Sequence, residues 1–476
     1  MSFNSWPFAV FLPVTFLLYW FVFQRRVRWQ NLFVVAASYL FYGWWDWRFL
    51  LLIAFTSGCC YLSGLGIERY ARHARLINAA NIVVNLAVLV FFKYWNFFVD
   101  SFAALFGLDP GSVTLNVILP VGISFYTFQA LSYSIDVYRR RIAAEHDPVV
   151  LFAYISFFPQ LVAGPIERAT QLLPQFGPAR TFRYEEAVDG CRLMLWGLFK
   201  KVVIADTCAE GANNIFAYYD SADGGILALG ALLFAFQIYG DFSGYSDIAI
   251  GCSKLFGIRL QRNFNVPYFS RDIAEFWRRW HISLNTWFRD YVYIPLGGSR
   301  CGRLCAVRNT FVIFLLSGLW HGANWTYVAW GAFHALLFVP LLLTGRNRRF
   351  SGPEAASLRE MPRMLLTLAL VCIGWIVFRS ETIADAWSYI MRMFRDFSAE
   401  GSLTQYLSRP SLRLLAWTMP LLLTAEWLSR NRAHALDFGP RGIFRFRAAR
   451  WSLYYILTIF ILANIGKVET FIYFQF

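Results

Sequence analysis

The chain has 476 residues, of which 58% are hydrophobic, 19% aromatic and only 15% charged. Soluble domains carry about 25% charged residues, so this composition excludes a disordered chain, a collagen-like chain and a small disulfide scaffold, and it argues against an ordinary cytosolic enzyme. The formal net charge is +15, but the basic residues gather in short loops between apolar runs, which indicates a membrane protein rather than a nucleic-acid binder. We therefore expect one polytopic, all-α integral membrane domain over residues 1–476.

Apolar runs recur nearly from end to end of the chain. An α-helix needs about 20 apolar residues to cross the hydrocarbon core of a bilayer. Several runs are short or interrupted by Gly or Pro, so we expect roughly 10–13 transmembrane or re-entrant helices around an intramembrane polar tunnel. The first run precedes three arginines and lacks a cleavage site, which favours an uncleaved span. The candidate runs are 6–23, 29–45, 49–67, 76–99, 112–135, 149–166, 226–250, 311–343, 364–378, 411–428 and 451–465.

Basic loops predict the orientation of the chain. Three Arg clusters follow the first, third and fifth runs, whereas segment 100–109 after the fourth run contains no Lys or Arg. The positive-inside rule places such clusters in the cytoplasm. It therefore predicts that the N-terminus, segment 379–410 and the C-terminus lie outside, and that the Arg-rich loops 345–363 and 429–450 lie inside. The three clusters are Arg25, Arg26 and Arg28; Arg69, Arg72 and Arg75; and Arg139, Arg140 and Arg141.

The middle of the chain, 167–310, carries charge inside or beside apolar stretches. Lys200, Lys201, Asp241 and Asp247 all lie there. Charge at membrane depth is expensive and usually faces a cavity or the protein interior. The two carboxylates could act as an acid and a base, but such groups more often satisfy buried backbone or Arg groups.

His321 lies inside an apolar run, where burial favours the neutral imidazole and so a competent general base. The alternative is a core histidine that is hydrogen-bonded to a backbone carbonyl. Ionisable residues within a membrane are functional by default, and Gly322 allows something to approach closely. His334 is 13 residues further on, a turn of about 220° on an unbroken helix, so we expect it to point away from His321 and to be structural.

The segment 271–290 has the spacing of an amphipathic helix. Its polar stripe would hold Arg278, His281, Asn285 and Arg289, either as the wall of a tunnel that binds an anionic ligand or as the solvated face of an interfacial helix. The basic, Gly-rich loop 295–303 could hold phosphates through its amides and arginines. Cys301 in this loop and Cys305 just after it have no nearby His or second Cys pair, so we expect no metal site.

Two motifs carry a resemblance to a known family. Trp320-His-Gly-Ala-Asn-Trp325 and Phe276-Trp-Arg-Arg-Trp-His-Ile-Ser-Leu284 resemble the membrane-bound O-acyltransferase family. Further matching segments run in order along the chain and together resemble the bacterial alginate O-acetyltransferase branch. The sequence departs from the family pattern at Asn285, where Ser is commoner, and at Glu469 and Thr470, where a Pro is often found. The further segments are 119–129, 161–168, 240–251, 293–300 and 471–476.

The resemblance implies a membrane-bound acyltransferase of the bacterial inner membrane, with its catalytic centre within about 226–343. It implies acetyl transfer from cytoplasmic acetyl-CoA toward a periplasmic polysaccharide, most simply alginate, together with periplasmic acetyltransferase or polysaccharide-modifying partner proteins. The essential histidine of the family matches His321, and the second matches His281. We expect His321 to act as general base and His281 to orient the thioester or stabilise the oxyanion. Arg278, Asn285 and Arg300 are the expected acetyl-CoA-binding residues.

Other functions stay open from the sequence. Related enzymes acetylate cellulose or peptidoglycan, and a cousin handles D-alanine for teichoic acids. A non-enzymatic transporter of an acylated carrier also needs polar groups at membrane depth, but it does not need a histidine in a closed apolar segment. Turnover of a thioester by the purified protein separates a transferase from a transporter.

Overall fold

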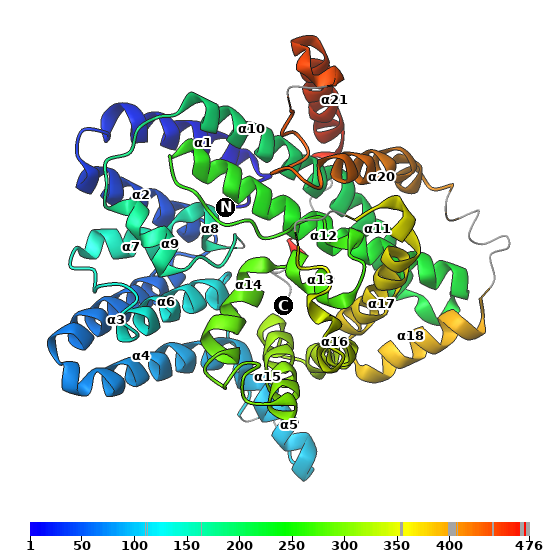
Figure 1. Ribbon diagram of the computed structural model, residues 1–476, viewed down its shortest axis with the longest axis horizontal. Helices are drawn as coiled ribbons and strands as arrows, with labels where there is room; N and C mark the ends of the chain where they lie inside the picture. The colour runs from blue at the N-terminus through cyan, green and yellow to red at the C-terminus, as the bar shows by residue number, and fades with distance from the viewer. Residues whose placement is uncertain are drawn as a thin grey trace. The chain divides into compact units, whose positions relative to one another are not determined.

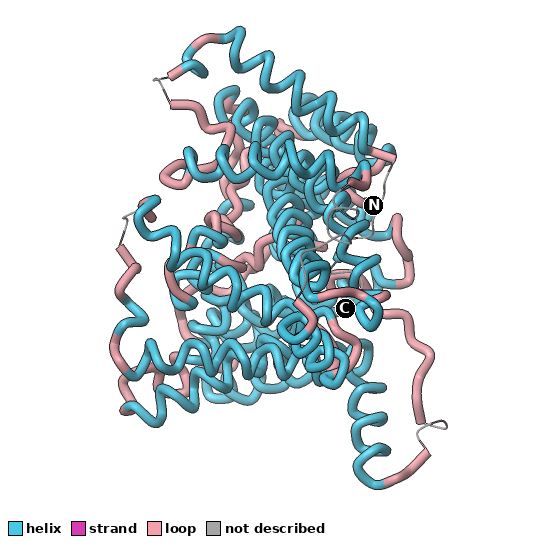
Figure 2. The backbone as a smooth tube through the Cα atoms, turned by 90° about the vertical axis from the view of Figure 1, so that its right-hand side faces the viewer, coloured by secondary structure: helices cyan, strands magenta, loops and turns pink. Residues whose placement is uncertain are grey.

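The computed structural model describes residues 1–109, 111, 113–162, 164–352, 356–397, 406, 408–439, 442–466 and 471–472. In these residues all regular secondary structure is helical and no strand is found (Figure 2), which confirms the all-α prediction. The predicted positions Glu469, Thr470 and 473–476 lie outside the described residues. Two compact units share the chain: Met1–Cys191 with Ala249–Gln261, and Arg192–Ile248 with Arg262–Phe476.

The first unit holds the N-terminal helices, of which α3, α4 and α6 pack against one another (Figure 1). Local signals start several of them. Ser5 accepts from Phe8 N (3.4 Å) before α1, and Asp147 accepts from Val149 N (2.9 Å) before α7, in each case with a proline in the first turn. The helices are α1 (Trp6–Leu17) continued by a π-helix (Leu18–Val22), α2 (Val27–Gly43), α3 (Phe49–Arg69), α4 (Ala74–Leu89), α5 (Trp95–Phe106), α6 (Ile123–Tyr138), α7 (Pro148–Ser156), α8 (Phe158–Leu161) and α9 (Ala169–Leu172).

The predicted run 149–166 is not one long helix but contains two short ones, α7 (Pro148–Ser156) and α8 (Phe158–Leu161). The nine residues of α7 extend about 14 Å, less than half of a hydrocarbon core of about 30 Å. Asp147, just before α7, pairs with Arg28 (3.7 Å), and Asn31 Nδ2 donates to the carbonyl of Phe176 (2.9 Å). Asp147 and Phe176, which flank this part of the chain, therefore both lie beside the first turns of α2.

The second unit contains the helices that carry the two histidine motifs. α10 (Tyr184–Leu198) and α12 (Gly224–Leu255) contribute residues to both units. The remaining helices are a π-helix (Phe199–Ala205), α11 (Asp206–Ala217), α13 (Ile273–Arg279), α14 (Ile282–Phe288), a π-helix (Arg289–Tyr293), α15 (Arg303–His321), α16 (Trp325–Leu343), α17 (Met361–Arg379), α18 (Ile383–Arg395), α20 (Pro410–Ser429) and α21 (Arg447–Asn464).

Six helices in the described part of the chain are long and apolar enough to cross a membrane, by length and composition. This finding confirms a multi-pass membrane protein, and the larger expected number of helices stays a prediction. The six are Phe49–Arg69, Ala71–Phe106, Gly224–Leu255, Arg303–His321, Trp325–Leu343 and Leu358–Arg379.

The predicted run 311–343 is not one helix but a hairpin of α15 and α16. α15 ends at His321, Gly322 is extended (φ −162°, ψ 157°), and Asn324 accepts from Thr326 N (3.1 Å) to start α16. Glycines let the two backbones touch, because a Cβ on Gly318 would lie 2.1 Å from the carbonyl oxygen of Tyr327. The hairpin therefore places residue 321 at the tip of a tightly packed pair of helices.

The buried charges of the second unit are paired with one another. Lys200 bonds Asp247 (2.8 Å), while Lys201 bonds both Asp206 (2.7 Å) and Asp241 (2.8 Å). Asp241 also accepts from the backbone N–H of Ile472 (2.7 Å). This confirms that the two carboxylates satisfy buried groups, and the cations that they meet are lysines rather than arginines.

Candidate active site

The predicted amphipathic helix over 271–290 is wrong, because the chain breaks at Trp280 and His281. Trp280 is extended (φ −104°, ψ 130°) and His281 is left-handed (φ 43°), an uncommon conformation for a residue other than glycine. Asn285 stabilises the break, since its Nδ2 donates to the carbonyls of Trp277 (2.6 Å) and Trp280 (2.5 Å). These bonds satisfy carbonyls at the end of α13 that the next turn of a continuous helix would otherwise bond.

The break also undoes the single polar stripe that the spacing predicts. His281 turns into the core and is 1% exposed, whereas Arg278 is half-buried and donates to the carbonyl of Asn347 (2.7 Å). Glu275, the acid three residues before Arg278, bonds Arg271 (3.0 Å) and Arg279 (2.9 Å). Arg278 is therefore tied to a neutral carbonyl rather than to an acid.

Asn263 holds the ring of His281. Its Oδ1 lies 3.1 Å from His281 Nδ1 and accepts from Ser283 N (3.3 Å) and Ser283 Oγ (2.9 Å). Because a backbone N–H can only donate, Oδ1 is the acceptor here, and the imidazole carries its proton on Nδ1. Burial lowers the pKa of His281 to about 3. The ring is thus neutral at physiological pH, with its lone pair on Nε2.

His321 stands at the end of α15 among aromatic rings and is 4% exposed. Its ring meets Trp330 (centroid distance 5.2 Å) and Phe378 (5.4 Å) edge-on. The ring centroids of His281 and His321 lie 6.3 Å apart, and Trp320 flanks both, at 5.7 Å and 5.0 Å. The structure therefore brings together the two histidines that the sequence singles out.

A close approach at Gly322 explains the glycine that follows His321. A Cβ on Gly322 would lie 2.0 Å from Cε2 of Tyr327, so the tyrosine ring packs directly on this backbone. The partner of the expected close approach is thus a side chain of α16. A larger residue at 322 would push Tyr327 away from the tip of the hairpin.

His334 lies nearer to His321 than the unbroken-helix argument predicts, because the two residues belong to different helices. Both rings contact Trp330, His334 at a centroid distance of 5.0 Å. His334 is fully buried and also packs on Trp277 (5.0 Å). Neither of its ring nitrogens has a hydrogen-bond partner among the described residues. Its role stays a prediction, namely that it is structural.

A cavity of about 170 Å³ adjoins this centre and contains two residues of the predicted stripe, Asn285 and Arg289. Trp277, which packs on His334, forms part of its wall. Arg300 does not line this cavity; it is exposed in the loop before α15, next to a disulfide between Cys301 and Cys305. Over the part of the chain that the structure describes, no group of three His, Cys, Asp or Glu could hold a metal ion. The cavity is lined by Trp277, Asn285, Phe288, Arg289, Tyr293, Thr310, Ile313, Phe314, Ser317, Phe338, Leu342 and Asn347.

Sequence reasoning missed Asn263, which orients His281 from 18 residues away. Nothing in the local sequence marks it, because an Asn in a polar loop is common and its contact is tertiary. It also missed Trp330, whose ring separates His321 from His334. A Trp in an apolar run carries no signal beyond burial.

Comparison with known proteins gives consistent relatives. Residues 139–379 match the membrane-bound O-acyltransferase family. The chain is 44% identical over 404 residues to the "Probable alginate O-acetylase" of Pseudomonas aeruginosa, covering 83% of this chain and 75% of that protein. It is 43% identical over 401 residues to the protein of the same name in Azotobacter vinelandii (83% and 78%), and 34% identical over 417 residues to the "Peptidoglycan O-acetyltransferase" of Helicobacter pylori (80% and 77%).

Proposed function

The chain belongs to the membrane-bound O-acyltransferase family, and from this premise we propose that it passes acetyl groups from cytoplasmic acetyl-CoA across the bacterial inner membrane for O-acetylation of alginate. The observation that carries the proposal is the buried pair of histidines, His281 and His321, with ring centroids 6.3 Å apart. Two imidazoles in a dry, aromatic-lined site are suited to proton transfer near neutral pH. The relatives named as alginate O-acetylases support the acceptor.

In this mechanism His321 takes the proton of the acceptor hydroxyl as that oxygen attacks the thioester carbonyl. A new C–O bond forms, the C–S bond breaks, and the CoA thiolate leaves and receives the proton from His321. General-base catalysis of this kind contributes about 10²–10⁴-fold. The acceptor hydroxyl belongs either to the sugar or to a serine of a periplasmic partner protein.

His281 acts as a positioning residue. Its Nδ1–H is directed at Asn263, so the neutral ring offers a lone pair at Nε2 and no second proton. Stabilising an oxyanion needs a donor, which this tautomer does not supply at Nε2. The tautomer therefore argues against the oxyanion role, and because the thioester group itself has no donor, Nε2 would instead orient a donor such as the acceptor hydroxyl beside His321.

The donor enters past Arg278 and Arg289. The adjoining cavity, about 170 Å³, is smaller than the roughly 300–1,000 Å³ of typical ligand pockets, which suits the narrow thioester arm rather than the nucleotide. The phosphates would then stay outside, where the exposed Arg300 and Arg278, which bonds the carbonyl of the lining residue Asn347, offer charged hydrogen bonds. Asn285 contributes by fixing the turn between α13 and α14.

Purified protein tests the proposal against its rivals. An acetyltransferase releases CoA thiol from acetyl-CoA when an acceptor is added, whereas a transporter of an acylated carrier leaves the thioester intact. Comparing alginate, cellulose and peptidoglycan oligomers as acceptors identifies the polymer. The Helicobacter pylori relative makes peptidoglycan the second candidate. A protein that binds acetyl-CoA but never releases thiol with any acceptor or periplasmic extract contradicts the proposal.

A further inference from the structure

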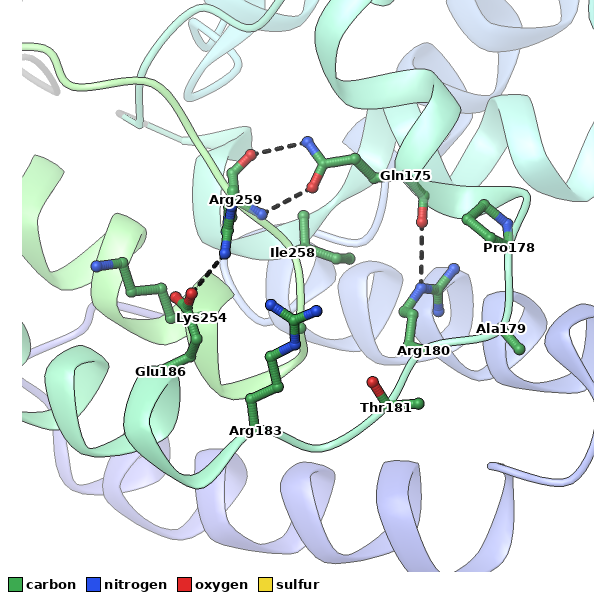
Figure 3. A pocket seen from close by; sticks show the side chains of 11 residues that line it. Gln175, Pro178, Ala179, Arg180, Thr181, Arg183, Glu186, Lys254, Ile258 and Arg259 are labelled. Atoms are coloured by element: carbon green, nitrogen blue, oxygen red, sulfur yellow. Dashed lines mark hydrogen bonds and ion pairs between the residues drawn. The ribbon is translucent and has the colours of Figure 1, made fainter.

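A second cavity, of about 330 Å³, lies in the first unit, outside the residues used above (Figure 3). It is bounded by the loop that follows α9, the start of α10 and the end of α12. Its charged lining is strongly basic, with four cations and one acid. These are Arg180, Arg183, Lys254 and Arg259, with Glu186.

Arg180 is a buried cation whose hydrogen-bond acceptors are all neutral. Its side chain is 7% exposed. Its Nη1 donates to the Tyr19 hydroxyl (2.9 Å) and to Gln30 Oε1 (3.2 Å), and its Nη2 donates to Asn31 Oδ1 and to the carbonyl of Phe176. Among the described residues no carboxylate forms an ion pair with it. A buried charge without a counter-charge is unfavourable, so an anion in the cavity would stabilise Arg180.

Two of the other three basic residues that line the cavity have a carboxylate partner, and one does not. Arg259 bonds Glu186 (2.5 Å), and Lys254 bonds Asp189, so each has its own acid. Arg183 is exposed and has no ion pair within the described ranges, and Figure 3 shows its guanidinium directed into the cavity between Arg180 and Glu186. Two guanidinium groups are thus left without an acid, which matches the charge and the acceptor oxygens of one phosphate.

The cavity lies where a membrane surface is expected. Tyr19 and Gln30, which bond Arg180, flank the turn that carries Arg25 and Arg26, predicted to be cytoplasmic. Exposed aromatic side chains typically mark the level of the lipid headgroups. Three are found beside this turn and this cavity: Phe21 (79% exposed), Trp29 (56%) and Tyr184 (74%).

We infer that this cavity binds a phosphate group, supplied by the headgroup of an anionic phospholipid of the cytoplasmic leaflet. Arg183 contacts the phosphate directly, and Arg180 supplies the fixed positive charge beneath it. The exposed Phe21 and Trp29, next to the Arg25–Arg26 turn in the sequence, and Tyr184, next to Arg183, would hold this part of the chain at headgroup depth. The site is independent of the proposed acetyl transfer, because none of its residues belongs to the histidine centre.

The test is the unfolding temperature of the full chain, purified in neutral detergent and titrated separately with phosphatidylglycerol, phosphatidylcholine, inorganic phosphate and CoA. A ligand that binds the folded state raises this temperature. We expect phosphatidylglycerol to stabilise the wild-type protein more than phosphatidylcholine does. Arg183→Gln should bind phosphatidylglycerol at least tenfold more weakly, and Arg183→Lys should retain part of the affinity. The control is Arg72→Gln, which removes an exposed arginine on the same predicted side of the membrane.

Each outcome decides the inference. An Arg183-dependent response to phosphatidylglycerol alone assigns the site to a lipid, and the same dependence with inorganic phosphate or CoA assigns it to a soluble phosphate. Equal responses of Arg183→Gln and Arg72→Gln to all four ligands overturn the phosphate site. Acetyl transfer is measured on the same variants without added lipid, and its rate should match that of the wild type. Loss of the phosphate site and failure of the proposed acetyl transfer therefore give different results.

Discussion

Replacing Asn263 with Ala removes the group that orients His281. Asn263 is fully buried, and its Oδ1 is the acceptor for His281 Nδ1 (3.1 Å), Ser283 N (3.3 Å) and Ser283 Oγ (2.9 Å). The hydroxyl can rotate toward another acceptor, but the ring N–H and the backbone N–H are fixed. The variant therefore removes the acceptor that these two buried donors share.

Each buried donor that loses its acceptor costs about 1–3 kcal/mol, so with two such donors Asn263→Ala should destabilise the protein by about 2–6 kcal/mol. The loss of activity has a different origin. With its Nδ1–H released, the ring of His281 can tilt or change tautomer, and a misplacement of about 1 Å in a catalytic group costs up to about 10²-fold in rate. We expect acetyl transfer to fall by about 10- to 100-fold in the protein that remains folded.

The assay pairs the unfolding temperature in detergent with the acetyl-transfer rate per folded molecule. Asn265→Ala is the matched control, because the Asn265 side-chain oxygen is buried and has no partner among the described residues. It should keep both values near those of the wild type. If Asn263→Ala matches Asn265→Ala in rate, Asn263 does not position His281 and the assigned tautomer is wrong.

The pH dependence of Asn263→Asp tests whether Asn263 acts by orienting His281 or only by filling space in the core. Burial holds the pKa of His281 at about 3, well below its ordinary value, so the wild-type ring stays neutral above about pH 4. A carboxylate facing Nδ1–H favours the imidazolium and raises this pKa. The acidic limb of the pH–rate profile should therefore move to higher pH, a change that loss of packing alone does not produce.

Other consequences can be measured independently. Gly318→Ala places a Cβ 2.1 Å from the carbonyl oxygen of Tyr327, so it should destabilise the α15–α16 hairpin by about 1–3 kcal/mol. Gly58→Ala, with open space around it in α3, should be neutral or stabilising. Equal unfolding temperatures for the two variants contradict the close packing of the hairpin. Arg278→Gln and Arg300→Gln should each weaken acetyl-CoA binding by about 1.5–3 kcal/mol. High salt should reduce this loss more for the exposed Arg300 than for the half-buried Arg278. If both variants bind acetyl-CoA as tightly as the wild type, the acetyl-CoA site lies elsewhere. In a variant without native cysteines, an impermeant thiol reagent added from the periplasm should label Glu381→Cys and spare Arg346→Cys, and the reverse pattern overturns the orientation.

The all-α membrane architecture follows from composition. The division of the run 311–343 into two helices could also have been predicted from the sequence. Thirty-three consecutive residues over 311–343 extend about 50 Å as a helix, far more than the hydrocarbon core of about 30 Å. Gly322 and Asn324 supply the usual signals for the end of one helix and the start of the next. The hairpin that carries His321 could therefore have been predicted from length and capping residues.

The break in the helix at His281 could not have been predicted from the sequence. Trp280 and His281 are neither Gly nor Pro, and the apolar spacing continues through them. The break depends on the amide of Asn285, which bonds the carbonyls of Trp277 and Trp280, and on Asn263 in a distant loop. Periodicity therefore predicted the wrong backbone here, and only tertiary contacts explain why His281 faces inward.

The most direct test of the central claim is acetyl transfer by His321→Ala, measured on protein confirmed to be inserted and folded. We predict that this variant retains acetyl-CoA binding but loses transfer by about 10²–10⁴-fold, the usual contribution of a general base. His334→Ala is the matched control, because it removes an equally buried imidazole that also contacts Trp330, and it should lose much less. Transfer by His321→Ala at the wild-type rate, or equal losses in the two variants, contradicts the assignment of His321 as the base.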